Sequence, residues 1–235
     1  MIEHPIELAI ELPERTRVAL GQSKPRATLV FTTPEGGEER MGVPVALAKR
    51  LQSKLDDDAL EASSRAELMH LIGEHARSCA MERIAALVNM RDYSEHDFKR
   101  KLRLDGYASS TVEACVQRAK ELRLIDDRRY ADAYIRSKVS QGWGRSRIER
   151  ELSAHGIAAA DVAGWPEEYL SGDAEAERAY ELAKRRPLKG SNDYERLMRY
   201  LCGRGYAPGV ASSAVNRVLA EAAATADEPL DGQFS

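Results

Sequence analysis

The sequence predicts a mainly α-helical protein, in which tandem three-helix repeats form an elongated, curved array after a small N-terminal domain that contains a β-hairpin. Charged residues make up 31% of the 235 residues and aromatic residues only 6%, with long stretches rich in Ala, Leu, Arg and Glu, a composition typical of helices. A spaced motif also returns at intervals of 50 and 49 residues, which is typical of a helical repeat.

The repeated motif is an apolar residue, a leucine four positions later, a glycine four positions after the leucine, and then a second apolar residue. Glycines at helix ends are common in any helical protein, because glycine readily adopts the left-handed conformation that ends a helix. Agreement at several positions at once favours a true repeat over this simpler explanation. The copies are Phe98, Leu102, Gly106 and Tyr107, then Ile148, Leu152, Gly156 and Ile157, then Leu197, Leu201, Gly205 and Tyr206.

The first part of the chain, residues 1–62, is predicted to be a small β-rich domain. Two or three strands are expected from residues 6–12, 28–32 and 40–45, with a turn at 34–37. Residues 46–51 fit either a helix or a strand. A domain of this size is expected to lean on the helices that follow it.

A connecting helix is predicted for residues 63–92, starting after Ser63 or Ser64 and with Gly73 as a candidate break. The first repeat is predicted for residues 93–140. Acidic residues three positions after two of its serines suggest capping boxes, and Gly106 is expected to end the first helix. The expected N-caps of the three helices are Ser94, Ser110 and either Asp126 or Asp127.

The second repeat is predicted for residues 141–187 and the third for residues 188–221. Trp143 lies in a tight turn between two glycines, where its ring is expected either to plug the seam between neighbouring repeats or to stack on a ligand. Plugging is favoured, because large aromatic side chains are mostly packing residues. Asp173 is expected to cap a helix in the second repeat. Residues 222–235 have little to bury and are predicted to be a disordered tail.

Basic residues are unevenly distributed. The net charge is −3, but residues 91–150 hold fifteen Lys and Arg against ten Asp and Glu. This excess predicts a modest basic patch that meets an anionic partner. The alternative is a helix face that is merely exposed to solvent, which is the more common explanation for a segment of mixed charge. The candidate binding residues are Lys99, Arg100, Lys101, Arg103, Arg128, Arg129, Arg136, Lys138, Arg145, Arg147, Arg150 and Arg185.

Several classes of protein do not fit the sequence. No apolar run approaches the roughly 20 residues of a membrane span, and the N-terminus lacks the pattern of a secretory signal, so a cytoplasmic protein is expected. Cys79, Cys115 and Cys202 lack metal-type spacing and are expected to be reduced core residues. No histidine ligand pair, phosphate-binding loop or nucleophile elbow occurs, which predicts no metal, no cofactor and no enzymatic activity.

The repeat region resembles the RecX family of bacterial regulators of the RecA recombinase. The resemblance is carried by RDYSEHDFKRKLRLDGY, ELRLIDDRRYADAYIRSK and QGWGRSRIERELSAHGI, is strong over residues 91–157, and stays in register to about residue 221. It implies tandem three-helix repeats that lie along the groove of the RecA–DNA filament, inhibit ATP hydrolysis and strand exchange, and limit filament growth.

The partners implied by this resemblance are the RecA filament and, more weakly, single- and double-stranded DNA, bound by a monomer. Two alternatives stay open at this point. One is a helical DNA-binding protein that reads phosphates without touching a recombinase, and the other is a protein–protein adaptor whose basic face meets an acidic partner.

Overall fold

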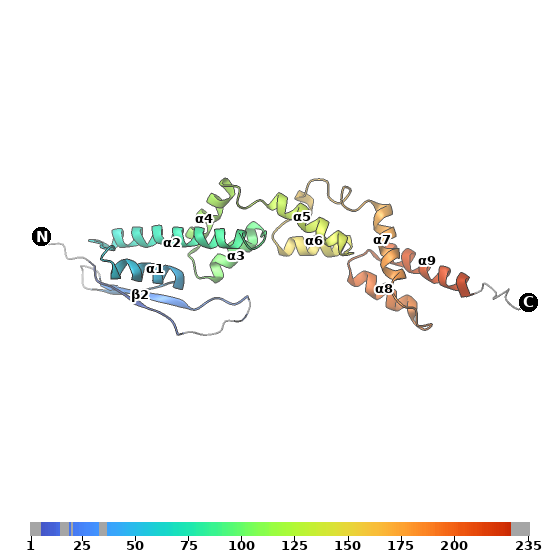
Figure 1. Cartoon of the computed structure of the whole chain (residues 1–235), viewed down its shortest axis with the longest axis horizontal. Helices are drawn as coiled ribbons and strands as arrows, with labels where there is room; N and C mark the ends of the chain where they lie inside the picture. Colours follow the sequence, from blue (N-terminus) through green and yellow to red (C-terminus); the bar gives the residue numbers. More distant parts are fainter. Residues whose placement is uncertain (1–5, 15–18, 20, 33–36, 227–235) are drawn as a thin grey trace, which may run out of the picture. The chain divides into compact units, whose positions relative to one another are not determined.

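The computed structural model describes residues 6–14, 19, 21–32 and 37–226, which form two compact units, Met1–Asp126 and Asp127–Ser235. The first unit holds a three-stranded antiparallel sheet and helices α1 to α4. The second unit holds helices α5 to α9 and a short 3-10 helix, η1 (Figure 1). The described residues are therefore mainly α-helical with a small N-terminal sheet, which confirms the predicted fold class.

The sheet is antiparallel throughout, in the order β1-β2-β3. Leu29 in the central strand pairs with Ile10 on one side and Met41 on the other. Every second residue of β2 is buried, as expected for a sheet with one face on a core. Residues 33–36, on which most of the predicted turn falls, lie outside the described residues. The strands are β1 Leu8–Glu11, β2 Arg26–Thr32 and β3 Glu38–Pro44.

Helices α1 (Val45–Asp56) and α2 (Arg65–Val88) complete the core of the sheet. The Ser64 side chain accepts a hydrogen bond from the Glu67 N–H, which makes Ser64 the N-cap of α2. The helix runs unbroken through Gly73, because the residues around it, such as Ile72 and Ala76, are buried in the same cluster as the sheet. The N-terminal domain therefore leans on α2.

The three glycines of the repeated motif lie in equivalent settings. Gly106, Gly156 and Gly205 follow α3 (Glu95–Leu104), α6 (Arg145–Ala154) and α8 (Asp193–Gly203), with φ angles of 95°, 75° and 91°. In each copy, the N–H of the residue after the glycine donates to the carbonyl of the repeat leucine, at 3.0 to 3.2 Å. This is the hydrogen bond of a Schellman motif, which ends a helix and buries the next apolar side chain. The repetition read from the sequence is thus present in the fold.

The predicted helix caps are partly right. Ser94 caps α3 by accepting a hydrogen bond from the Asp97 N–H at 3.2 Å. The prediction for Ser110 is wrong, because α4 (Ser109–Glu121) follows Ala108 and has no side-chain cap. The prediction for Asp173 is also wrong, since it lies in the first turn of α7 (Gly172–Lys184). In both cases the helix begins earlier in the chain than predicted, so the expected cap residue lies inside its first turn. Helix α5 (Asp127–Ser140) begins at one of the two predicted aspartates.

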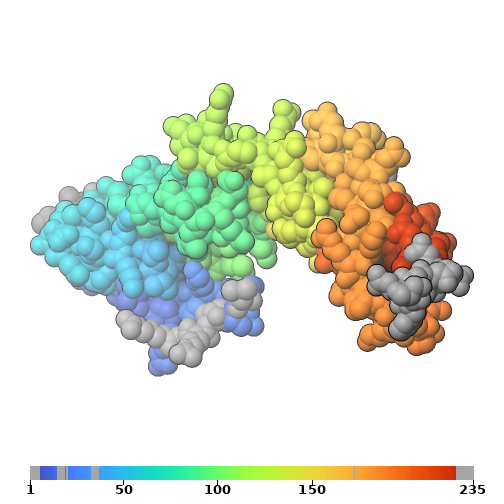
Figure 2. All heavy atoms as spheres, turned by 45° about the vertical axis from the view of Figure 1, so that its right-hand side comes forward, coloured from blue at the N-terminus to red at the C-terminus, as the bar shows by residue number. Residues whose placement is uncertain are grey.

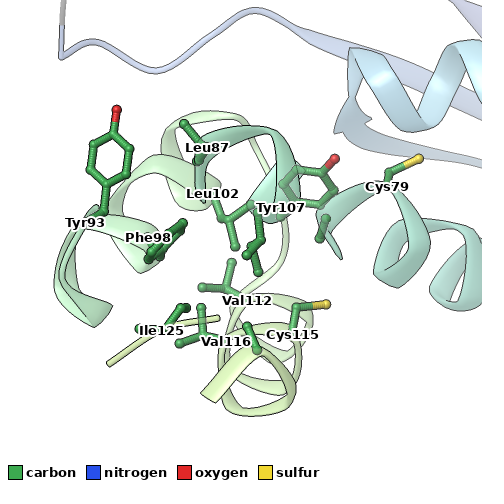
Figure 3. Close-up of a cluster of buried hydrophobic side chains, with 13 residues drawn as sticks. Cys79, Leu87, Tyr93, Phe98, Leu102, Tyr107, Val112, Cys115, Val116 and Ile125 are labelled. Carbon is green, nitrogen blue, oxygen red and sulfur yellow. The ribbon is translucent and has the colours of Figure 1, made fainter. Parts of the chain in front are cut away.

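The hydrophobic clusters group the helices in threes. The C-terminal half of α2 shares a cluster with α3 and α4, and Figure 3 shows Phe98 and Leu102 from α3 beside Val112 and Val116 from α4. Helix α5 shares a cluster with α6 and the residues around η1, and α7 shares one with α8 and α9. The predicted boundaries after residues 140 and 187 separate these partners. We propose that each repeat begins one helix earlier, with α2, α5 and α7.

Three further expectations differ from the structure. The middle helix of the second repeat is only the 3-10 turn η1 (Ala159–Asp161), because few apolar residues there have helical spacing. Helix α9 (Pro208–Ala226) continues five residues into the predicted tail, where alanine favours helix, while residues 227–235 lie outside the described residues. Cys202 is exposed, because α8 buries the stripe of Leu197 and Leu201 instead.

Repeats two and three are joined by a contact between backbones. The Gly144 N–H donates to the Arg204 carbonyl at 2.9 Å, and the Ser146 N–H donates to the Gly205 carbonyl at 3.1 Å. Figure 2 shows the atoms of α6, in yellow, against those of the third repeat, in orange. A Cβ atom added to Gly144 would lie 2.5 Å from the carbonyl group of Gly205. We call this contact the glycine junction.

Replacing Gly144 by alanine should destabilise the second unit by about 2 kcal/mol, because the added methyl group overlaps backbone that cannot move aside easily. Gly203→Ala is the matched control, since no atom lies within 4 Å of its added Cβ. Urea unfolding followed by tryptophan fluorescence measures the effect, because Trp143 and Trp165 are the two tryptophans of the chain and both lie in the second unit. Equal stability of the two variants would contradict the close contact.

Asp193 organises the entry to α8. Its carboxylate accepts a hydrogen bond from Arg196 and from the N–H groups of Lys189 and Gly190, the latter two at 2.9 and 2.8 Å. The Arg196 hydrogen bond, followed by those of the backbone, holds the pKa of Asp193 below its usual value. A carboxylate with a lowered pKa stabilises the fold above its unfolded pKa of about 3.9, and this stabilisation is lost as the pH falls through the folded pKa.

The variant Asp193→Asn should therefore be less stable than the wild type at neutral pH, and the difference should shrink as the pH falls below about 4. Glu195→Gln, on the same helix turn and exposed, should change stability little at either pH. Urea unfolding by tryptophan fluorescence at both pH values checks this expectation. A difference that stays constant or grows on acidification would mean that the Asp193 charge does not stabilise the fold.

Candidate functional site

Most of the predicted basic residues on α3 are held in ion pairs. Lys99 Nζ lies 2.5 Å and Arg103 Nη2 lies 2.8 Å from the carboxylate oxygens of Glu113. Arg100 Nη2 lies 3.0 Å from Asp97 Oδ1. The pKa of Lys99 is raised by its hydrogen bond to Glu113, and the pKa of Glu113 is lowered in return. Their charges are largely compensated, so this face of α3 is only weakly positive.

Arg136 and Arg145 in the second unit are also paired. Arg136 Nε lies 3.0 Å from both carboxylate oxygens of Asp132, and its hydrogen bond lowers the pKa of Asp132. Arg145 Nε lies 2.8 Å from Glu149 Oε1, one helical turn away. Exposed ion pairs of this kind add little to the stability of the fold, but in each of them a carboxylate offsets one positive charge of the surface.

Arg128 and Arg129 lie in the exposed first turn of α5. Arg128 lines a cavity of about 580 Å³ together with Asp127, Asp132 and Asp161. The surroundings of Arg128 are therefore mixed in charge, which weakens its case as part of a basic surface.

Lys138 and Arg147 have aromatic partners. Lys138 Nζ lies 4.6 Å and Arg147 Cζ lies 3.8 Å from the centre of the Trp143 ring. A ring face attracts a cation through its quadrupole and orders the side chain without cancelling its charge. Trp143 packs on the core of the second repeat and is only partly buried, so it presents two ordered cations at the surface. The seam between the repeats is made by the glycines on either side of this tryptophan.

A second group of this kind surrounds Tyr200 in the third repeat. Arg186 Cζ lies 4.1 Å and Arg204 Cζ lies 5.1 Å from the centre of its ring. Arg204 also donates from Nη1 to the carbonyl of Gln141 at 2.8 Å, across the glycine junction. The Trp143 and Tyr200 groups therefore meet at one place in the second unit. We call them together the junction surface, comprising Lys138, Trp143, Arg147, Arg186, Tyr200 and Arg204.

The first unit contains a similar group around Tyr93. Lys101 Nζ lies 4.7 Å and Arg91 Cζ lies 4.5 Å from its ring centre. Tyr93 stands thirteen residues before Gly106, and Trp143 stands thirteen residues before Gly156, so the two aromatic residues are equivalent positions of the repeat. Of the predicted residues on α3, Lys101 is thus the one with an aromatic partner.

Two further predicted residues, Arg150 and Arg185, are exposed, and no carboxylate lies within ion-pairing distance of either among the residues that the structure describes. The candidate residues predicted from the sequence included Arg185 but not its neighbour Arg186, and neither Tyr200 nor Arg204 was predicted. A signal was present, because residues 184–204 hold seven Lys and Arg against two Asp and Glu, the same excess of five as in residues 91–150 over a third of the length. The two parts of the junction surface are distant in sequence and are brought together by the glycine junction and by the hydrogen bond from Arg204 to Gln141.

The structure gives little support for a catalytic site built around a nucleophilic cysteine. A cavity of about 740 Å³ in the first unit is lined by Cys79, Arg50 and Glu82 among others. Burial raises the pKa of the Cys79 thiol, which keeps it protonated and unreactive at neutral pH. Arg50 Nη2 is 2.6 Å from Glu82, so the charges of this lining compensate one another.

Two kinds of site are also absent from the described ranges. No group of three His, Cys, Asp or Glu side chains there is placed to hold a metal ion. None of the helices within those same ranges combines the length and the apolar character needed to cross a membrane.

Comparison with known proteins gives consistent matches. The family model described as RecX, second three-helix domain, matches residues 126–163, which cover α5, α6 and η1. The chain is 31% identical over 128 residues to the regulatory protein RecX of Vibrio vulnificus, covering 51% of this chain and 80% of that protein. It is 36% identical over 78 residues to the regulatory protein RecX of Actinobacillus pleuropneumoniae, covering 33% and 52% of the two chains.

Solved structures share the fold. The crystal structure of RecX from Lactobacillus salivarius superimposes with a TM-score of 0.53 at 16% identity, covering 62% of this chain and 97% of that one. A second crystal structure, of a regulatory protein RecX, gives a TM-score of 0.51 at 18% identity and covers 90% of this chain and 97% of the other. The two solved structures show that the fold is shared. The identity of 31% to the Vibrio vulnificus protein, over 80% of that protein's length, shows that the chain belongs to the RecX family of regulatory proteins.

Proposed function

We propose that this protein is a non-catalytic regulator that binds the RecA–DNA filament and restrains RecA-dependent ATP hydrolysis, strand exchange and filament growth. Membership of a family named for regulation supports the proposal, as does the resemblance that links this family to RecA. The observation that carries it is the repeated placing of cations on aromatic rings, at Tyr93, Trp143 and Tyr200.

Surfaces of this kind suit a long, negatively charged and periodic partner. Each exposed cation gives only a small gain on binding, but successive repeats act together, because the first contact raises the effective concentration of the next. Contacts to phosphates or carboxylates also weaken steeply with salt. A filament regulator of this kind acts by occupying sites, as a monomer and without a cofactor.

The junction surface predicts which substitutions matter. Lys138→Gln combined with Arg147→Gln should raise the concentration needed for half-maximal inhibition of RecA-dependent ATP hydrolysis on single-stranded DNA about tenfold. The reason is that two partly exposed positive charges, each contributing up to about 1 kcal/mol to binding, are lost. Arg136→Gln with Arg145→Gln is the matched control. It removes the same charge from the same unit, but from side chains whose charges Asp132 and Glu149 already compensate. Arg136 also lies 5.3 Å from the centre of the Tyr169 ring, so the control differs from the test variant in charge compensation and not in ring contact alone.

The control double variant should inhibit almost as well as the wild type. Equal losses in the two variants would assign the effect to net charge alone and remove the junction surface from the mechanism. If the wild-type protein leaves RecA-dependent ATP hydrolysis unchanged at all concentrations, the proposed function is wrong. Binding to bare DNA or to another acidic protein would then identify the activity instead.

A further inference from the structure

We propose that the cavity in the first unit binds a small organic molecule that is uncharged, mainly apolar and equipped with one hydrogen-bond acceptor, such as a carbonyl oxygen. The cavity measures about 740 Å³, within the range of about 300–1,000 Å³ that is typical of small-molecule sites. This site goes beyond the proposed function and does not depend on it, because none of the residues that line the cavity belongs to the junction surface.

The cavity lies where the N-terminal domain meets the first repeat. The domain supplies Pro44, at the end of β3, and Ala46, at the start of α1. The helical part supplies Cys79 on α2 and Tyr107, which follows α3. All of these elements belong to one compact unit, so the walls of the site are assembled by the fold of a single chain.

The first support is a buried polar group without a partner. Tyr107 is only 7% exposed, and no hydrogen-bond partner of its hydroxyl is found among the residues that the structure describes. In Figure 3 this hydroxyl points away from Phe98 and Val112, toward the side on which Cys79 lies. Burial raises the pKa of the Tyr107 hydroxyl, so the group stays protonated at neutral pH and can donate. An acceptor on a ligand would satisfy a hydroxyl whose burial otherwise costs free energy.

The second support is an apolar lining that needs little ordering. Three prolines, Pro13, Pro25 and Pro44, line the cavity together with Ala46. Proline and alanine lose no rotamer freedom when a ligand covers them, so the entropy cost of binding is small. Burial of apolar ligand surface against these walls is therefore available as a driving force. The lining favours a ligand whose body is apolar.

The third support is the compensation of charge within the lining, which holds three cationic and three carboxylate side chains. Lys24 and Arg83 both pair with Asp105, at 2.6 and 2.8 Å. Arg50 pairs with Glu82 at 2.6 Å. An anionic ligand would find each of these cations already paired and would lose its hydration without a new counter-ion. The cavity therefore favours an uncharged ligand over a phosphate or a carboxylate.

The test uses Nile red, an uncharged dye that carries a carbonyl acceptor and fluoresces strongly in apolar surroundings. Its emission should rise and saturate when it is titrated with the full chain. Ala46→Phe should weaken binding about tenfold, because Ala46 is an exposed residue of the lining and a larger side chain there obstructs the cavity without entering the core. Ala66→Phe is the matched control, since Ala66 is also exposed and second in its helix but is not part of the lining.

A second variant isolates the hydroxyl. Tyr107→Phe keeps the ring that packs in the hydrophobic cluster and removes only the donor, so Nile red should bind about fivefold more weakly, the effect of one lost hydrogen bond. Without ligand, this variant should be at least as stable as the wild type, because the hydroxyl has no partner to lose. Thermal unfolding followed by far-UV circular dichroism measures this stability and shows whether Ala46→Phe is folded.

Three results would each overturn the site: no saturable binding of Nile red, equal binding by Ala46→Phe and Ala66→Phe, or wild-type binding by Tyr107→Phe. The anionic dye anilinonaphthalene sulfonate tests the charge of the ligand. It should bind this cavity more weakly than Nile red does. Binding that is as tight as that of Nile red, and as sensitive to Ala46→Phe, would contradict the assignment of an uncharged ligand.

Discussion

The arrangement of the second unit depends on one close approach of backbone to backbone, between Gly144 and Gly205. Neither residue has a Cβ atom, so the N–H groups at the start of α6 reach the carbonyls at the end of α8. Gly205 serves twice, because its positive φ also ends α8. The contact fixes repeat three against repeat two and brings the Trp143 and Tyr200 groups together. A side chain at either position would separate both the repeats and the surface that they share.

This protein orders its long cationic side chains in two ways, with different results. A carboxylate partner, such as Glu113 for Lys99, holds the side chain and cancels its charge. An aromatic partner, such as Trp143 for Arg147, holds the side chain and leaves its charge available. The first kind predominates on α3. The second kind occurs at Tyr93 and Trp143, which are equivalent positions of two repeats, and again at Tyr200. A count of basic residues does not distinguish them, although their effects on an anionic partner are opposite.

The sequence carried enough information for the repeat and for part of the surface. The motif glycines and the Ser94 cap depend on neighbours within a few residues, so local spacing reveals them. The pairing of Lys99 with Glu113, on two different helices, depends on how α3 packs against α4, which no local pattern specifies. For the same reason the contact of Arg204 with Gln141, sixty-three residues apart, could be found only in the folded chain.

The distribution of the cysteines has a practical consequence. Cys79 and Cys115 are buried in the first unit, whereas Cys202 is exposed on α8, two residues from Tyr200. A thiol-reactive dye added to the native chain would therefore attach mainly at one position, on the third repeat and beside the junction surface. The wild-type protein thus already carries a single addressable reporter for ligands that approach this face, with no engineered attachment point.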